Sequence, residues 1–169
     1  KLQLEQARAR LSGKNHGEHF IAYFQSFTNT YADVDTLRNL FLPAISEPSV
    51  VGLSVATRPD CLPQNIIELI NELNQIKPVF IELGLQTIHE KTAQFIRRGY
   101  ELKTYDEAVS RLQKTGVHII THMILGLPGE TKEMMMQTAK HIGNVGSHGI
   151  KLQLLHVLKG TDLATFYEG

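Results

Sequence analysis

Apolar segments recur along the chain at a spacing of roughly thirty to forty residues, which is the length of one strand–helix unit. They predict strands over residues 19–25, 50–57, 78–86, 117–125 and 149–157. Between them, apolar positions fall on one helical stripe over residues 33–45, 62–74 and 131–145. Strands that alternate with helices predict an α/β fold with a parallel sheet.

Local signals predict two further helix starts. Thr87 with Glu90, and Thr104 with Glu107, have the spacing of capping boxes, in which the two side chains satisfy the first free N–H groups of a helix. Gly116 stands where a glycine is expected after the second of these helices. The polar stretch over residues 11–17 is predicted to be a loop.

The two faces of the predicted strands differ in character. Alternate positions on one face are aliphatic: Val51, Leu53 and Val55; Val79, Ile81, Leu83 and Leu85; Ile150, Leu152 and Leu154. The opposite face is mostly small or polar: Gly52, Ser54, Ala56 and Arg58; Phe80, Glu82, Gly84 and Gln86; Lys151 and Gln153. A doubly wound sheet needs two apolar faces, and a closed barrel fills its lumen with branched side chains. The asymmetry therefore predicts a partial, open TIM-like barrel of about five βα units around a polar hollow.

Composition narrows the function classes. The 169 residues are enough for a single domain, and 17 basic residues balance 17 acidic ones, which argues against a general nucleic-acid or anionic-membrane binder. No apolar run is long enough to span a bilayer. Cys61 is the only cysteine, which excludes an internal disulfide, favours a cytoplasmic setting and cannot by itself hold an iron–sulfur cluster.

The carboxyl ends of the predicted strands gather glycine, proline and polar residues, and ligands bind at these ends in barrels and open α/β sheets alike. Each segment alone has a plain structural interpretation. Leu127–Glu130 is also typical of a type II turn, and Gln86 would equally satisfy a loop carbonyl. Arg98 fits a solvated charge at a helix end, and His122 fits a core histidine. The histidines show no metal-ligand spacing, so no metal site is predicted.

Taken together, these segments are far more specific. The order of ELGLQT (82–87), RGY (98–100) and THMILGLPGE (121–130) resembles the core of radical S-adenosylmethionine (SAM) enzymes. The segments AYFQ (22–25), TNTYA (28–32), TRPDCL (57–62) and LHVLKGT (155–161) are similar to one bacterial family of uncharacterised radical SAM proteins. That family is related to the radical SAM domain of the elongator acetyltransferase and to oxygen-independent coproporphyrinogen oxidase.

The resemblance implies a partial (βα)6 barrel in which a [4Fe-4S] cluster reductively cleaves SAM to a 5′-deoxyadenosyl radical, which then abstracts hydrogen from a substrate. In such enzymes a CxxxCxxC-type loop after the first strand holds the cluster, and it would precede the helix expected at residues 2–11. This sequence contains no such loop. We therefore expect residues 1–169 to be a radical SAM core that lacks its first βα unit, a fragment that is inactive and unable to bind the cluster.

The resemblance also implies roles for individual residues. Gln86 matches a ribose-contacting position and Arg98 matches the arginine that meets the methionine carboxylate. Gly126–Glu130 match the turn on the adenine side. Phe24–Ser26 stand where many members carry Gly-Gly-Glu, and Ala56 and His122 replace acidic residues of the porphyrinogen enzyme, so those contacts do not transfer. The expected cofactor-binding residues are Gln25, Glu82, Gln86, Arg98, His122, Gly126, Leu127, Pro128 and Gly129.

Two other functions fit the same architecture. A TIM-barrel hydrolase or aldolase would need an acid/base pair, for which Glu82 and Asp60 are the available candidates. A non-catalytic nucleotide- or partner-binding module would use the rim alone. The substrate is not determined by the sequence. The strand over residues 19–25 has no charge or proline to protect its edge, so we expect it to dimerise, or residues 1–10 to cover it.

Overall fold

The computed structural model describes residues 18–168. The expected helix at residues 2–11 and loop at 11–17 lie outside them, as does the expected cover of the first strand by residues 1–10. The strands are β1 (Phe20–Phe24), β2 (Val50–Thr57), β3 (Val79–Gln86), β4 (His118–Leu125) and β5 (Gly149–Leu154). The helices are α2 (Val34–Ile45), the 3-10 turn η1 (Pro59–Cys61), α3 (Gln64–Asn74), α4 (Glu90–Phe95), α5 (Leu102–Gln113), α6 (Lys132–Asn144) and α7 (Asp162–Glu168).

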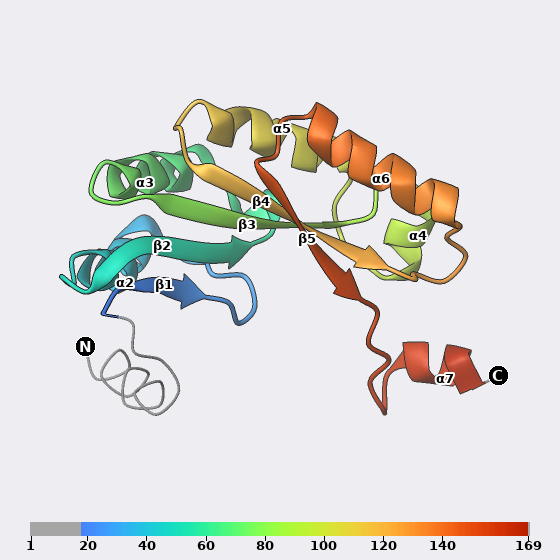
Figure 1. The fold of residues 1–169 in the computed structure, drawn as a ribbon. Coiled ribbons are helices and arrows are strands. Elements are labelled where there is room, and N and C mark those ends of the chain that lie inside the picture. The colour runs from blue at the N-terminus through green and yellow to red at the C-terminus, as the bar shows by residue number, and fades with distance from the viewer. Residues whose placement is uncertain (1–17, 169) are drawn as a thin grey trace.

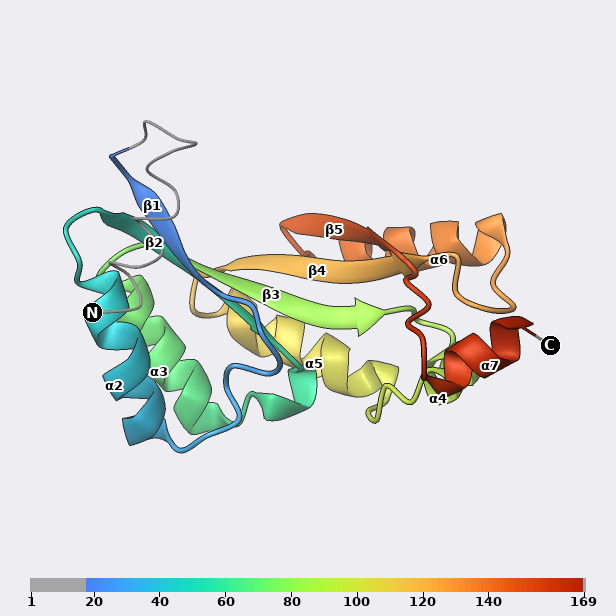
Figure 2. The same cartoon turned by 90° about the horizontal axis from the view of Figure 1, so that it is seen from below.

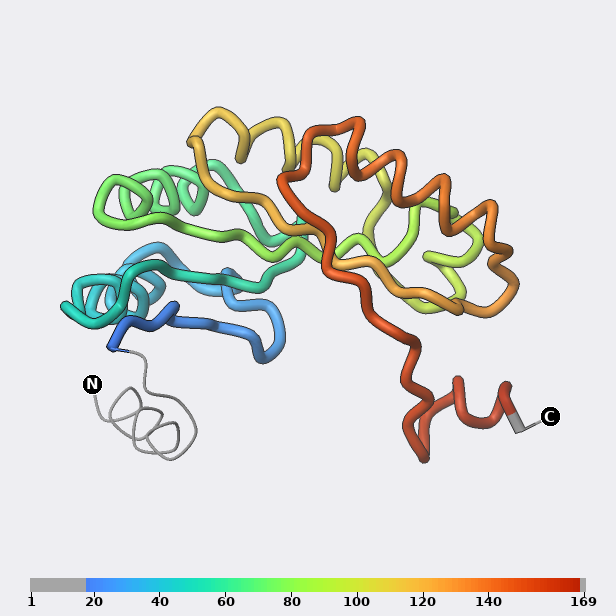
Figure 3. The backbone as a smooth tube through the Cα atoms, viewed as in Figure 1, coloured from blue at the N-terminus to red at the C-terminus, as the bar shows by residue number. Residues whose placement is uncertain are grey.

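The five strands are parallel and follow one another in the order β1-β2-β3-β4-β5. They form a curled sheet with α2, α3, α5 and α6 along its outer side (Figures 1 and 2). The tube in Figure 3 shows that the chain leaves β5 as an extended segment before α7. This half-barrel confirms the predicted α/β fold with an open, TIM-like arrangement.

The core lies between the sheet and the outer helices. Side chains of β3 alternate between buried and half-buried, and Val79, Ile81, Leu83 and Leu85 are fully buried, as predicted. Asp33 accepts a hydrogen bond from the Thr36 N–H (2.9 Å) at the start of α2. The stripes expected over residues 33–45, 62–74 and 131–145 become α2, α3 and α6 with small shifts at their ends.

Two of the predicted strand faces differ from the structure. Val51 is 45% exposed and Val50 is buried, because the β1–β2 register shifts by one residue between Phe20 and Ile21 and reverses the alternation there. The apolar face of β5 is also exposed, although it was expected to be covered. Strand β5 is the edge of the sheet, and the described helices leave its outer face largely open.

Both predicted capping boxes are wrong. Thr87 donates its hydroxyl to Glu130 and accepts the His89 N–H (3.1 Å), and α4 begins at Glu90 with His89 as its N-cap. Helix α5 begins at Leu102, two residues before Thr104, because the Glu90 carboxylate of α4 accepts the Leu102 N–H (3.0 Å). Gly116 does follow the helix in a left-handed conformation (φ 71°), as predicted.

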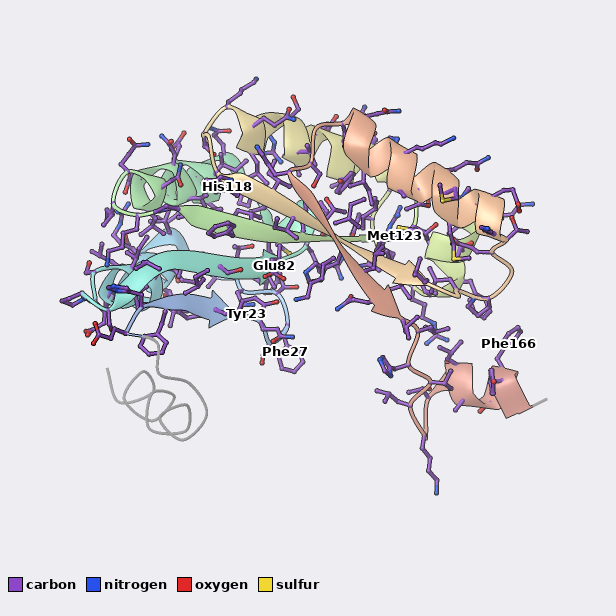
Figure 4. The ribbon with its side chains drawn as sticks, viewed as in Figure 1. Tyr23, Phe27, Glu82, His118, Met123 and Phe166 are labelled. Carbon is purple, nitrogen blue, oxygen red and sulfur yellow. The ribbon has the colours of Figure 1, made fainter. Side chains whose placement is uncertain are left out.

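A polar network crosses the concave face of the sheet and joins all five strands. Its centre is the Glu82 carboxylate of β3, which accepts hydrogen bonds from Tyr23 of β1 (2.6 Å) and Ser54 of β2 (2.8 Å). It also bonds His122 Nε2 of β4 (2.6 Å) and Lys151 Nζ of β5 (2.9 Å). Figure 4 shows Tyr23 and Glu82 on the concave side, away from the outer helices.

The hydrogen bonds keep Glu82 ionised. Burial alone would raise its pKa, but the bonds from Tyr23, Lys151, His122 and Ser54 lower the pKa from 4.5 to about 2. Because the folded state has the lower pKa, the unfolded chain takes up the proton first as the pH falls. The contribution of the ionised Glu82 to the free energy of unfolding is complete above about pH 5 and is lost as the pH falls from 4.5 towards 2.

Replacement of this carboxylate should therefore destabilise the chain in a pH-dependent way. We expect Glu82→Gln to lower the free energy of unfolding at neutral pH by about 2 kcal/mol, because Lys151 loses a charged acceptor. The difference from wild type should shrink as the pH falls to about 3. Urea titrations at both pH values measure it, with the exposed Glu107→Gln as control. An equal loss at both pH values would contradict this assignment.

The edge strand yields a second prediction. Within the described residues only β2 pairs with β1, and we propose that the other edge of β1, over residues 21–24, pairs with a second copy of the chain. Ile21→Lys, at a position 52% exposed, should then reduce self-association in sedimentation velocity. Ile76→Lys, at a similarly exposed position (48%) outside the sheet, should not. A wild-type chain that sediments as a monomer over a wide concentration range would refute the proposal.

Candidate functional site

A cavity of about 860 Å³ lies at the carboxyl ends of β2, β3 and β4 and beside the segment after β5. Its volume is in the range of small-molecule sites. Its wall combines polar and apolar side chains: Arg58, Gln86, Arg97, Arg98, Tyr100 and Asp162, with Phe95, Ile124, Leu127, Leu155, Leu163 and Phe166 among the apolar members. The expected location at the carboxyl ends of the strands therefore contains a pocket.

Gln86 occupies a strained turn at the end of β3. Its φ of 66° is rare for a non-glycine residue, and the Thr87 N–H bonds back to the Leu85 carbonyl (2.8 Å) across it. The β3–β4 register shifts at this point. A Cβ on Gly84 would lie 2.8 Å from Gln86 Nε2, so the glycine leaves room for the glutamine amide. Strain of this kind concentrates at functional sites.

Arg98 holds this turn from the side of α4. Its side chain is 1% exposed, and Nη1 donates to the carbonyls of Thr87 (2.6 Å) and Leu85 (3.4 Å), the two neighbours of Gln86. Nε donates to the Tyr100 carbonyl (2.9 Å) and Nη2 to Glu90 (3.1 Å). The guanidinium is thus a brace for the turn in which Gln86 sits.

Tyr100 completes the support of Gln86. Its hydroxyl bonds to the Gly84 carbonyl (2.5 Å) and lies 3.4 Å from Gln86 Oε1. Burial raises the pKa of this phenol, so it remains a hydrogen-bond donor at physiological pH. The guanidinium groups of Arg98 and Arg58 lie 4.8 and 5.3 Å from the centre of its ring.

The glycine-rich segment after β4 forms a tight turn. Glu130 N–H bonds to the Leu127 carbonyl (3.1 Å), with Pro128 second and Gly129 third at φ 80°, as expected for a type II turn. Gly126 has the same left-handed φ. Leu127 lines the cavity, and the Thr87 hydroxyl, bonded to Glu130, ties this turn to the end of β3.

Helix α7 forms the outer wall of the cavity. Phe166 packs edge-to-face on Phe95 of α4 (ring centroids 5.1 Å apart), and Arg97 pairs with Asp162 (2.5 Å). Both ionic side chains are about 80% exposed, so the pair adds little stability. Figure 4 shows Phe166 on the C-terminal helix α7.

Not all of the expected residues meet at the cavity. Gln86, Arg98 and Leu127 line it, and Gly126, Pro128 and Gly129 shape the adjoining turn. Gln25 follows β1 and is exposed. Glu82 and His122 bond to each other in the lumen and are not among the lining residues.

Several residues of the site were missed as candidates. Tyr23 and Lys151 complete the Glu82 network, and Tyr100 and Arg58 line the cavity. Arg58 and Tyr100 stand within the TRPDCL and RGY segments, which were the available signal. Asn29 was also missed, and it anchors the loop after β1 by donating to the carbonyls of Phe24 (3.0 Å) and Ala56 (2.9 Å).

The network argues against the hydrolase interpretation. Glu82 is held ionised by four partners, and Asp60 forms two hydrogen bonds with Arg58 (2.9 and 2.7 Å). A general acid needs a proton near neutral pH, and the hydrogen bonds that lower the pKa of Glu82 disfavour that role for it. The two carboxylates thus serve as hydrogen-bond acceptors.

The residues present do not fit an iron–sulfur cluster. Cys61 is the single cysteine of the sequence, and burial raises the pKa of its thiol, whereas clusters are held by several thiolates. Among residues 18–168, no three His, Cys, Asp or Glu side chains are grouped so that they could share a metal ion. No helix in the same range is long and apolar enough to cross a membrane.

Comparison with known proteins gives relatives over nearly the whole chain. The uncharacterized protein YtqA of Bacillus subtilis (strain 168) is 45% identical over 166 residues, which are 98% of this chain and 52% of YtqA. Elongator complex protein 3 of Schizosaccharomyces pombe is 31% identical over 122 residues, 70% of this chain and 22% of that protein. The chain thus spans about half the length of YtqA.

Solved structures share the fold. The archaeal Methanocaldococcus infernus Elp3 with an N-terminal deletion superposes with a TM-score of 0.82 at 21% identity, over 99% of this chain and 44% of that chain. The radical SAM enzyme HemN of Escherichia coli, a coproporphyrinogen III oxidase, has a TM-score of 0.52 at 13% identity, over 89% and 48%. The family model of the Radical SAM superfamily matches residues 3–142, and the chain therefore belongs to the radical SAM superfamily.

Proposed function

We propose that this chain is the SAM-binding part of a radical SAM enzyme. The observation that carries the proposal is the strained Gln86 turn, which opens onto a cavity of about 860 Å³ and is braced by Arg98 and Tyr100. Such a turn costs folding energy and persists only when its surroundings enforce it. Membership of the radical SAM superfamily supports SAM as the ligand.

The residues suit the parts of a nucleoside. The Gln86 carboxamide offers both a donor and an acceptor, which matches the vicinal hydroxyls of a ribose. Ile124 and Leu127 supply an apolar wall for a purine, and the left-handed Gly126 and Gly129 allow the backbone to approach its edge closely. The lumen beneath the cavity, with Tyr23 and Lys151, would face the substrate.

In the whole protein, a [4Fe-4S] cluster held by residues other than those of this chain would supply the electron for the reductive cleavage of SAM. Because this sequence has one cysteine, the chain would supply only the adenine and ribose side of the site. A cytoplasmic setting, where thiols stay reduced, is part of the same proposal.

Ligand binding tests the role of Gln86. We expect Gln86→Ala to weaken binding of S-adenosylhomocysteine about tenfold in calorimetry, because the ribose loses a hydrogen-bonding partner. Alanine has about the same backbone strain as glutamine at a φ of 66°, so the variant measures the contribution of the Gln86 side chain alone. Gln64→Ala on α3, which is not among the residues that line the cavity, should bind as the wild type does. If Gln86→Ala bound S-adenosylhomocysteine with unchanged affinity, the prediction that Gln86 binds the ribose would be wrong.

Product formation tests the activity. The full-length protein, reconstituted with iron and sulfide and given a reductant, should form 5′-deoxyadenosine from SAM, as measured by chromatography. The 169-residue chain treated identically should form none, because one cysteine cannot hold the cluster. Absence of the product from a reconstituted full-length protein would refute the radical SAM activity.

A further inference from the structure

The segment that joins β5 to α7 buries very little of its surface. Every residue from 156 to 161 is exposed, and Figure 3 shows that the chain is extended there before it turns into the helix. Gly160 makes this turn with a left-handed φ of 82°, and a Cβ at Gly160 would have no neighbour within 4 Å. A segment with few buried contacts opens at a low cost in free energy. Residues 156–161 therefore form an exposed tether for α7.

The hydrogen bonds that start α7 lie within its own segment. The Thr161 hydroxyl accepts the Ala164 N–H (3.3 Å), and the Thr161 carbonyl accepts the N–H groups of Ala164 (3.0 Å) and Thr165 (3.3 Å). The same hydroxyl donates to the Leu158 carbonyl (2.7 Å). Because these bonds join only residues 158–165 to one another, the turn and the helix can move together without losing them.

Weak side-chain contacts hold α7 against the α4 side of the cavity. Phe166 and Phe95 pack edge-to-face, but they remain 59% and 46% exposed. Arg97 pairs with Asp162 where both side chains are about 80% exposed, and an ion pair in water contributes little. Contacts of this strength break and re-form readily. The seam between α4 and α7 is thus weaker than the packing of the sheet against its outer helices.

The cavity therefore has one fixed wall and one weakly held wall. On the fixed side, Arg98 is 1% exposed and its hydrogen bonds hold the turn at Gln86. The weakly held side consists of residues from the end of the tether and from α7: Thr161, Asp162, Leu163 and Phe166. A ligand that touches both walls stabilises the arrangement in which α7 is closed, because only that arrangement offers all of its contacts.

We propose that α7 is a lid, which moves on the tether to admit the ligand and closes over it, with the Arg97–Asp162 pair as its latch. The inference rests on the proposed function, which makes the ligand a SAM-like nucleoside. It also explains the weakness of the seam, because a lid that must open to exchange its ligand cannot be held by a large buried contact.

Hydrogen exchange on the full-length protein tests the movement of the lid. Without ligand, the amides of residues 164–168 should exchange much faster than those of α6, a helix of the outer layer. Saturating S-adenosylhomocysteine should slow exchange in residues 164–168 at least about tenfold and leave α6 within about twofold. Exchange in α7 that is as slow as in α6 without ligand would overturn the inference. Fast exchange that bound ligand leaves unchanged would show fraying alone and would overturn it as well.

Exchange of the two latch charges tests the latch. Arg97→Asp and Asp162→Arg each place like charges face to face, so each should speed dissociation of S-adenosylhomocysteine about threefold in stopped flow. The double variant restores an opposite pair and should dissociate at about the wild-type rate. Lys91→Asp, at an exposed position of α4 that does not line the cavity, is the charge-matched control and should leave the rate unchanged.

The double variant separates a latch from a direct contact with the ligand. If Arg97 or Asp162 acted by touching the ligand, the exchanged pair would dissociate at least as fast as the single variants, and the latch would be wrong. If the wild-type protein bound S-adenosylhomocysteine while α7 stayed unchanged in hydrogen exchange, the lid alone would be refuted. If the wild type did not bind this nucleoside in calorimetry, the proposed function would fail and the lid would fall with it.

Discussion

The Glu82 carboxylate is the interaction on which the shape of this half-barrel depends. A parallel sheet with helices on one side leaves its concave face without a hydrophobic partner. One ionised carboxylate, accepting from partners on each of the other four strands, holds that face together. Because the donors come from all of the other strands, the network favours a curled sheet over a flat one. The curvature in turn brings the carboxyl ends of the strands around one cavity.

The concave side therefore has two levels with different tasks. The lower level, around Glu82, is internally satisfied and holds the strands. The upper level begins where the β3–β4 register shifts and the backbone turns at Gln86. There Gln86 adopts a strained backbone conformation, and the side chains of Arg98 and Tyr100, from the segment after α4, hold it in place. Strain at the rim is tolerable because the hydrogen-bonded sheet below it is rigid.

Periodicity predicted the sheet because side-chain direction in a strand is fixed by parity, as the alternating burial of β3 shows. Periodicity failed at Val51, where a bulge reverses the alternation of the side chains. The local spacing that predicted the capping boxes failed as well, because Thr87 and Glu90 bond to groups outside their own helix turn. Glu82 and His122 were identified as candidates, but their mutual bond was not. Contacts between strands depend on register and curvature, which a single sequence does not encode locally.

The same reasoning explains why the segments were informative only together. ELGLQT and RGY are separate in sequence but form one unit, because Arg98 and Tyr100 donate to the carbonyls of Gly84, Leu85 and Thr87. Gly84 leaves room for the Gln86 amide of its own segment, and Gly99 of RGY leaves room for the Arg58 guanidinium of TRPDCL. Arg58, from TRPDCL, joins the unit through the Tyr100 ring. Any one segment has a plain structural explanation, but their combination specifies a turn that no isolated segment could hold.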